Sequence, residues 1–267
     1  MACMFDTHAH LDGEEFDSDR RDVVDRALTA GVKAVLVPNI DLKSLQKLES
    51  VCEEYKGFFF PMIGLHPENV AEMESNDLEL FEARLSETSK FVGIGEIGLD
   101  FYWDETFRER QMDVFDEQLQ MALRHDLPVM IHARNAEKEI IDVMQQYRGK
   151  GLKGVFHCFT GGEEYASQLL TFDGFCLGVG GVLTFKKSTL PDTLAAVVPV
   201  DRIVLETDSP YMAPAPNRGK RNESSFVLYV ANKLADIYQI SLEQVQRQTS
   251  INAAGIFNCL APFLDSY

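Results

Sequence analysis

The sequence lacks the features that would assign it to a membrane or a secreted class. No apolar run approaches the ~20 residues that a helix needs to cross a bilayer. No basic segment followed by an apolar one opens the chain, so we expect no secretory signal. The five cysteines are odd in number and none has Cys-x-x-Cys spacing. We therefore expect a protein of the reducing cytoplasm, without membrane association.

Positive charge is also scarce. Lysine and arginine total 25 against 42 aspartates and glutamates, which gives a net charge of −17. This balance argues against a large basic face for duplex DNA, because non-specific affinity comes from neutralised phosphates. A nucleic-acid substrate held by a few local cations and a metal stays compatible with it, whereas tight sequence-specific binding does not.

Apolar, strand-like stretches alternate with amphipathic, helix-like ones along the whole chain of 267 residues. Helix caps are expected at Ser18, Asp41 and Ser241. The tail from residue 224 reads as two or more helices. The strands are expected at residues 4–5, 33–38, 58–63, 91–95, 127–131, 154–156, 175–179 and 203–205.

Eight such units without a linker or a composition break favour one domain over residues 1–267. Eight parallel units close most economically into an α/β TIM (β/α)8 barrel. A doubly wound open sheet is the runner-up. It would need a phosphate-binding glycine loop near the first strand, and the sequence has none there.

The first strand runs into the segment Asp-Thr-His-Ala-His at residues 6–10. Residues two apart on an extended segment point to the same face, so His8 and His10 should converge on one point. Histidine is the commonest metal ligand. The pair by itself is equally compatible with a metal site and with two ordinary N-terminal histidines.

The other strands decide between these alternatives, because polar residues recur where they end. Barrel active sites are built on this strand-end face. Five of the six histidines fall at such positions, which is improbable for a random distribution and predicts a metal site. The side chains that follow the third, fourth, fifth, sixth and eighth strands are His66, Glu96, His132, His157 and Asp208.

The expected ligands outnumber the four of a closed zinc site, so we predict two divalent ions. We assign His8, His10 and Asp208 to one ion and His132 and His157 to the other. Glu96 bridges both ions, and Glu96 and Asp208 are the candidate catalytic residues. Imidazole ligands suit Zn or Mn better than Mg, although availability can override this preference.

Further residues are candidates for binding substrate. Arg134 shares a face with His132 and could bind an anionic group, or form a surface salt bridge. His66 could contact substrate or be a satisfied loop histidine, and we favour substrate. The densest basic run, after the eighth strand, reads as a phosphate clamp rather than a solvated loop. Its charged members are Arg218, Lys220 and Arg221.

Four more residues near the strand ends have two readings each. Asp100 and Glu206 could orient ligand histidines or serve as turn and cap residues. Tyr102 and Trp103 could stack a base, but a packed loop is slightly favoured.

These segments resemble the TatD family of metal-dependent hydrolases, commonly described as TatD-type DNases. The matching pieces include Gly-Leu-His-Pro at 64–67, Gly-Glu-Ile-Gly-Leu-Asp at 95–100, His-Cys-Phe-Thr-Gly at 157–161 and Glu-Thr-Asp-Ser-Pro-Tyr at 206–211. The resemblance implies a TIM barrel, a divalent-metal site on the six ligands, and nuclease activity, often 3′→5′ on single-stranded DNA. One departure is Ser224, where the family usually has proline. It touches the start of a helix rather than a ligand.

Two functions from different classes stay open. One is a phosphodiesterase acting on nucleic acid, with single-stranded DNA as the expected substrate and no obligate protein partner. The other is an amidohydrolase-like enzyme that cleaves a small amide, ester or lactone. The basic run at 218–221 favours the first, because a phosphate needs cations and a neutral amide does not. A non-catalytic scaffold is a distant third.

Overall fold

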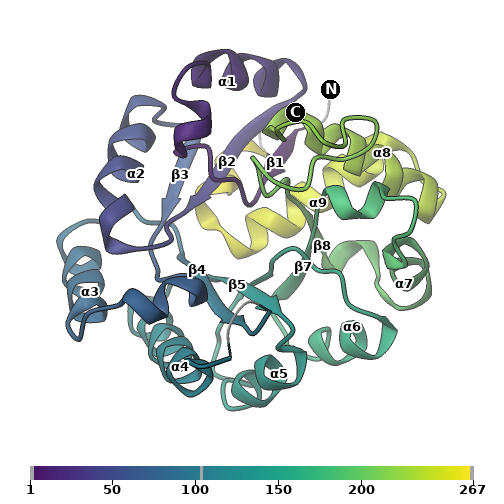
Figure 1. Cartoon of the computed structure of the whole chain (residues 1–267). Helices are drawn as coiled ribbons and strands as arrows, with labels where there is room; N and C mark the ends of the chain where they lie inside the picture. Colours follow the sequence, from purple (N-terminus) through teal and green to yellow (C-terminus); the bar gives the residue numbers. More distant parts are fainter. Residues whose placement is uncertain (1–2, 103–104, 265–267) are drawn as a thin grey trace.

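The computed structural model describes residues 3–102 and 105–264, and it shows a ring of strands surrounded by helices (Figure 1). The strands are β1 (Met4–Asp6), β2 (Val32–Pro38), β3 (Phe59–Met62), β4 (Ile94–Asp100), β5 (Val129–Arg134), β6 (Gly154–Phe156), β7 (Phe175–Val179) and β8 (Ile203–Leu205). The outer helices are α1 (Arg20–Thr29), α2 (Leu42–Glu54), α3 (Asp77–Glu87), α4 (Arg108–His125), α5 (Glu137–Gln145), α6 (Glu163–Leu169), α7 (Leu190–Val197) and α8 (Val227–Tyr238).

The strands are parallel and follow chain order around the ring. Strands β1 to β3 form one hydrogen-bonded set and β4 to β8 a second. A bridge between Ile63 and Ile94 joins the sets at one seam. At the other seam, Thr7 N–H donates to the carbonyl of Leu205 at 3.0 Å. The predicted TIM (β/α)8 barrel is therefore confirmed.

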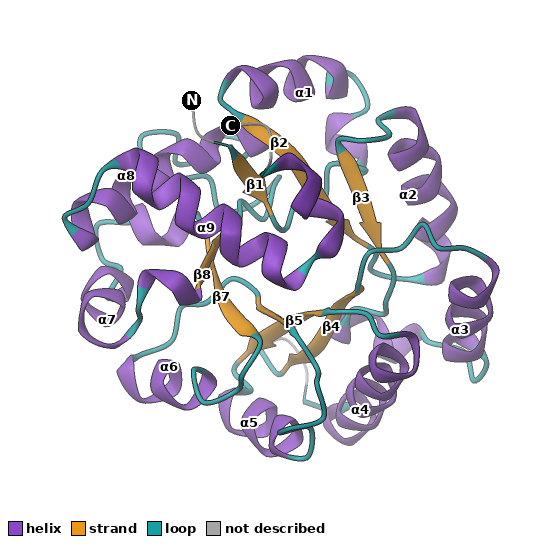
Figure 2. Ribbon diagram, turned by 180° about the vertical axis from the view of Figure 1, so that it is seen from behind, coloured by secondary structure: helices purple, strands orange, loops and turns teal. Residues whose placement is uncertain are grey.

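The barrel interior is packed with side chains and closed at one end by α9 (Leu242–Ile256). Figure 2 shows α9 lying across the end of the barrel that holds the strand N-termini. Ser241 caps this helix through a capping box with Gln244, as predicted. The strand side chains that pack against α9 and its continuation are Phe5, Leu36, Met62, Met130, Val155, Cys176 and Val204.

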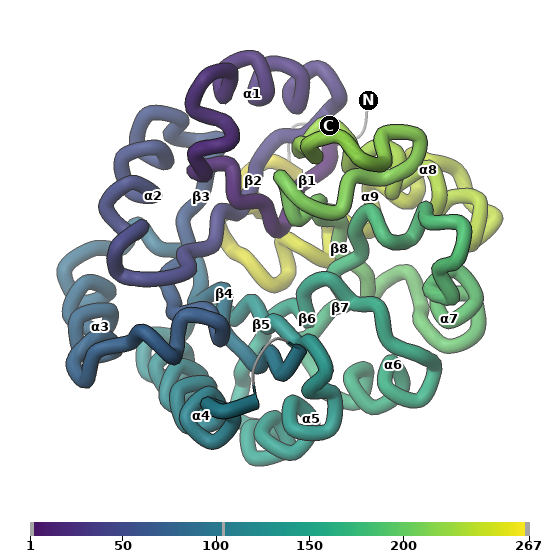
Figure 3. Tube along the Cα trace, in the orientation of Figure 1, coloured from purple at the N-terminus to yellow at the C-terminus, as the bar shows by residue number. Residues whose placement is uncertain are grey.

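Closing one end leaves the opposite end, where the strands finish, for a site. The tube in Figure 3 shows the segment after β8 beside the segment after β1 on that face. Asp208 N–H donates to the carbonyl of His8 at 2.9 Å, and His10 N–H donates to that of Ser209 at 2.8 Å. Within the described residues, no helix is both long and apolar enough to cross a membrane.

Three expected boundaries are wrong. The cap of α1 is Asp19 rather than Ser18, and β5 covers 129–134 instead of 127–131, so His132 lies inside it. Strand β4 covers 94–100 instead of 91–95, so Glu96 lies inside it. The glycines in this stretch suggest from sequence that the strand ends at residue 95, because glycine is unfavourable in strands. Gly98 is needed there, since a Cβ on it would lie 2.0 Å from the His132 carbonyl oxygen.

Candidate metal centre

The segment leaving β1 brings two histidines to one point. His8 is fully buried, and the side chain of His10 is 19% exposed. The Nε2 atoms of the two rings lie 3.2 Å apart. This convergence follows from the alternation of side chains along an extended segment.

Glu96 lies at the centre of the site and turns one carboxyl oxygen towards each of two groups. Its Oε2 lies 3.1 Å from Nε2 of His8 and 3.4 Å from Nε2 of His10. Its Oε1 lies 2.8 Å from Nδ1 of His132 and 3.4 Å from Nε2 of His66. This two-sided placement is what a bridging carboxylate needs.

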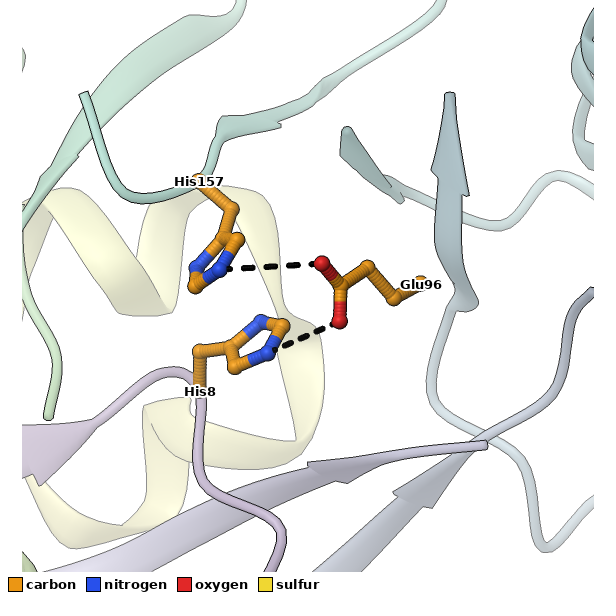
Figure 4. Close-up of side chains that lie close together, drawn as sticks. All are labelled: His8, Glu96 and His157. Carbon is orange, nitrogen blue, oxygen red and sulfur yellow. Dashed lines mark ion pairs between the residues drawn. The ribbon is translucent and has the colours of Figure 1, made fainter. Parts of the chain in front are cut away.

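His157 stands between the two groups. Its ring stacks on that of His8 with the centroids 3.5 Å apart, whereas 6.3 Å separates it from the ring of His132. Figure 4 shows both His157 and His8 directed at Glu96, with 3.7 Å between Nε2 of His157 and Oε1 of Glu96. The assignment of His157 to the same ion as His132 stays a prediction, and His8 is its nearer neighbour.

Asp208 closes the site from the β8 side. Its Oδ1 lies 3.7 Å from Nε2 of His8, 3.8 Å from Nε2 of His10 and 3.9 Å from Nε2 of His157. The side chain is 17% exposed, against 3% for Glu96. Asp208 is therefore the carboxylate that solvent reaches more easily.

The donor set fits divalent metal ions, because imidazole nitrogens and carboxylate oxygens converge here in overlapping clusters. In each cluster the donor atoms lie within 4.8 Å of one another. Glu96 belongs to two clusters, and its bridging role stays a prediction. The clusters are His8 with His10 and Asp208, His8 with Glu96 and His157, His66 with Glu96 and His132, and His157 with Cys158 and Glu206.

Two buried carboxylates orient the ligand histidines from behind, as one of the two sequence readings proposed. Asp100 Oδ2 lies 2.9 Å from Nε2 of His132. Glu206 Oε1 lies 3.1 Å from Nδ1 of His157 and accepts the N–H of Cys158 at 2.6 Å. Each ring is thereby fixed with its other nitrogen towards Glu96.

A buried network ties β1 to the segment that carries Asp208. Asp6 accepts the hydroxyl of Thr207 at 2.6 Å and the hydroxyl of Ser224 at 2.5 Å. Burial raises the pKa of Asp6 to about 7, against the effect of these hydrogen bonds. Sequence reasoning saw Ser224 only as a helix start, because no local pattern links residues 218 positions apart.

The site holds opposite charges in close contact. Burial by itself would raise the pKa of Glu96. The nearby imidazoles of His8, His66 and His157 lower it by more, so the pKa is held well below its usual range. Burial opposes protonation of His132, yet hydrogen bonds to Asp100 and Glu96 raise its pKa to about 9. Protons thus occupy positions that a metal ion would take.

His66 differs from His132 and His157 in the partner of its second ring nitrogen, which is a backbone N–H rather than a carboxylate. Its Nδ1 accepts the N–H of Glu68 at 3.2 Å, at the start of the short helix Pro67–Glu72. The neutral ring therefore carries its proton on Nε2, which faces Glu96. A protonated nitrogen donates a hydrogen bond instead of binding a metal, which supports the predicted role in binding substrate.

Cations stand around the strand ends. The Arg134 guanidinium lies 3.7 Å from the centroid of the Tyr102 ring, and that of Arg218 lies 3.5 Å from the centroid of Phe185. Lys220 is exposed. Sequence reasoning missed Lys186 and Lys187, two exposed lysines directly after Phe185 in the loop that follows β7. Their pairing in a loop that follows a strand was the available signal.

Arg221 has other partners. Its guanidinium donates to both carboxylate oxygens of Asp19 at 2.9 and 2.6 Å and to the carbonyl of Glu15. It also stacks over the ring of Phe16. These contacts hold the loop after β8 against the start of α1. Trp103, for which a packed loop was favoured over base stacking, lies outside the described residues.

The barrel and its convergent histidines and carboxylates define a metal-dependent hydrolase. The model of TatD related DNases matches residues 5–258. The chain belongs to this TatD family.

Known proteins similar to this chain cover it almost completely. The metal-dependent hydrolase YabD of Bacillus subtilis is 36% identical over 254 residues, 95% of this chain and 98% of YabD. A 3'-5' ssDNA/RNA exonuclease TatD of Pantoea vagans is 32% identical and covers 95% of this chain and 99% of its own length. The solved TatD homologue YJJV of Escherichia coli K12 has a TM-score of 0.90 at 30% identity, covering 97% of this chain and 99% of its own.

Metal binding should release protons. The raised pKa values, about 9 for His132 and about 10 for His157, keep both rings protonated near neutral pH when no ion is bound. A metal needs the neutral ring, so about two protons should leave on binding. This release should fall, and apparent affinity rise, as pH passes through these values. Calorimetry in buffers of different ionisation enthalpy measures it, and a buffer-independent heat would contradict it.

The carboxylate behind His132 should matter for metal affinity. Replacing Asp100 by Asn removes the charge that orients this ring, and we expect metal affinity to fall roughly 10- to 100-fold. The matched control is Asp142→Asn, which removes a carboxylate paired with Lys138 on the surface of α5. Competition titrations with a chelating dye give both affinities. Equal affinities in the two variants would refute the orienting role.

Proposed function

We propose that the protein is a deoxyribonuclease that removes nucleotides from the 3′ end of single-stranded DNA. The observation that carries the proposal is the placement of Glu96 between two ligand groups under a rim of cations. Such a pair of sites suits in-line displacement at phosphorus. The Pantoea vagans relative, a 3'-5' ssDNA/RNA exonuclease by name, supports this choice.

The chain's own residues divide the work. Glu96 would bridge two divalent ions, Mg, Mn or Zn, with His8, His10, His132, His157 and Asp208 as the remaining ligands. When bound, the ions supply an activated water and neutralise charge on a phosphoryl oxygen. Asp208, the more accessible carboxylate, takes the proton of the attacking water.

Substrate contacts come from the rim. The Nε2–H of His66 can donate to a phosphoryl oxygen, since its Nδ1 is already occupied by Glu68. Arg134, Arg218 and Lys220 supply positive charge to neighbouring phosphates. This concentration of cations in an acidic chain favours phosphodiesters over neutral amides. We assign Arg221 a different role, that of an anchor for the loop after β8, because its guanidinium is bound by Asp19.

Removing metal or its bridge should abolish activity. Chelator should stop release of 3′-terminal nucleotides from 5′-labelled single strands, and added Mg²⁺ or Mn²⁺ should restore it. Glu96→Ala should lose at least one ion per chain and more activity than Arg134→Ala, because Glu96 faces both ligand groups. Metal analysis and a cleavage time course measure both. Full turnover by metal-free protein would overturn the proposal. Hydrolysis of carboxylic esters and amides without any cleavage of phosphodiesters would overturn it as well.

Capture of the strand should depend weakly on salt. With a net charge of −17, only a few phosphates can be neutralised. At ~0.7 per phosphate for single strands, the log–log slope of affinity against salt should be about −1 to −3. The double variant Arg218→Ala/Lys220→Ala should make this slope shallower. Arg221→Ala should instead chiefly loosen the loop after β8. Anisotropy with a non-catalytic metal measures the slopes, and a value steeper than about −5 would reveal an extended basic surface.

A further inference from the structure

Several exposed apolar side chains lie in loops on the face where the strands end. Among the described residues, the exposed large hydrophobics divide between these loops and the helices. Most of those in the loops follow strands that carry the candidate site. Those in loops after strands are Ile40, Tyr102, Tyr211 and Met212, and those on helices are Leu28, Leu80, Tyr229 and Ile251.

The two rim tyrosines belong to different sides of the metal centre. The N–H of Tyr102 donates to Asp100 Oδ1 at 2.9 Å, and the other oxygen of Asp100 orients His132. The N–H of Tyr211 donates to the carbonyl of Asp208 at 2.8 Å. The backbone of Tyr102 therefore lies beside the His132 group, and that of Tyr211 beside the group that contains Asp208.

Tyr102 combines the two features that a nucleotide needs. Its side chain is 50% exposed, and the guanidinium of Arg134 lies 3.7 Å from the ring centroid. A base can stack on the exposed part of such a ring, where every base offers a π-face. The cation at the same place attracts the phosphate attached to that base.

Tyr211 has a different electrostatic environment. It is 57% exposed, and burial together with the charges of Glu15, Asp208 and Glu68 raises the pKa of its phenol. Carboxylates repel phosphates and accept hydrogen bonds from the amino groups of bases. A base that stacks on Tyr211 can therefore donate hydrogen bonds to these carboxylates, whereas Arg218 and Lys220 of the same loop are the groups for phosphates.

We propose that Tyr102 and Tyr211 bind, by stacking, the bases on the two sides of the scissile phosphodiester. This inference rests on the proposed function and specifies its substrate as a strand whose terminal bases are unstacked. Bases in a duplex stack on each other and cannot reach the two rings. In this way an acidic protein binds a nucleic-acid strand through the bases of the strand as well as through its phosphates.

The experiment compares ordinary single strands with strands that carry an abasic site at the terminal or the penultimate nucleotide. Each of Tyr102→Ala and Tyr211→Ala should lower kcat/KM on the ordinary strand roughly 5- to 100-fold, mainly through KM. Tyr102→Phe and Tyr211→Phe keep the ring and should retain activity. Tyr229→Ala, which removes an exposed tyrosine from α8, is the matched control and should change nothing.

The abasic strands separate stacking from indirect effects. On the strand that lacks the stacked base, the matching alanine variant should equal the wild type. Equal losses on ordinary and abasic strands, or no loss on either, would overturn the inference while hydrolysis by the wild type still supports the proposed function. Failure of the wild type to cleave any strand would overturn both. Metal content and thermal unfolding verify that each variant is folded and loaded.

Discussion

The rest of the site depends on one buried carboxylate. Glu96 is 3% exposed, and an isolated charge at that depth would cost several kcal/mol. Imidazoles from the ends of four other strands surround it, which makes burial tolerable and holds its pKa well below the usual range. The same contacts draw the strand ends together, so the electrostatics of the site and the closure of the barrel support each other.

Burial of this charge is made possible by close approach of backbones. Gly98 lets β4 lie against the carbonyl of His132, where any side chain would collide. Behind the ligands, Asp100 and Glu206 hold the rings of His132 and His157. The centre is therefore preorganised by hydrogen bonds that reach from strand to strand rather than along one loop.

Under the proposed function, the scarcity of cations limits where substrate contacts can lie. In a chain of net charge −17, long-range attraction for a polyanion is absent, so local groups have to supply it. Arg134 and Arg218 both rest on aromatic rings, which places charge and an apolar surface together at the rim. In the proposed nuclease, metal ions, a few cations and exposed rings would thus replace a basic groove.

The order of strands and helices, and the histidines at strand ends, followed from the sequence because apolar periodicity and motif spacing are local properties. The bounds of β4 did not, since glycines that weaken an isolated strand are required where β4 packs on β5. Nor did the bond from Ser224 to Asp6, or the engagement of Arg221 by Asp19, which join residues more than 200 positions apart. Such contacts form only when the barrel closes. Residue types and their spacing therefore determined which chemistry is available, and the tertiary structure alone decided which side chains meet.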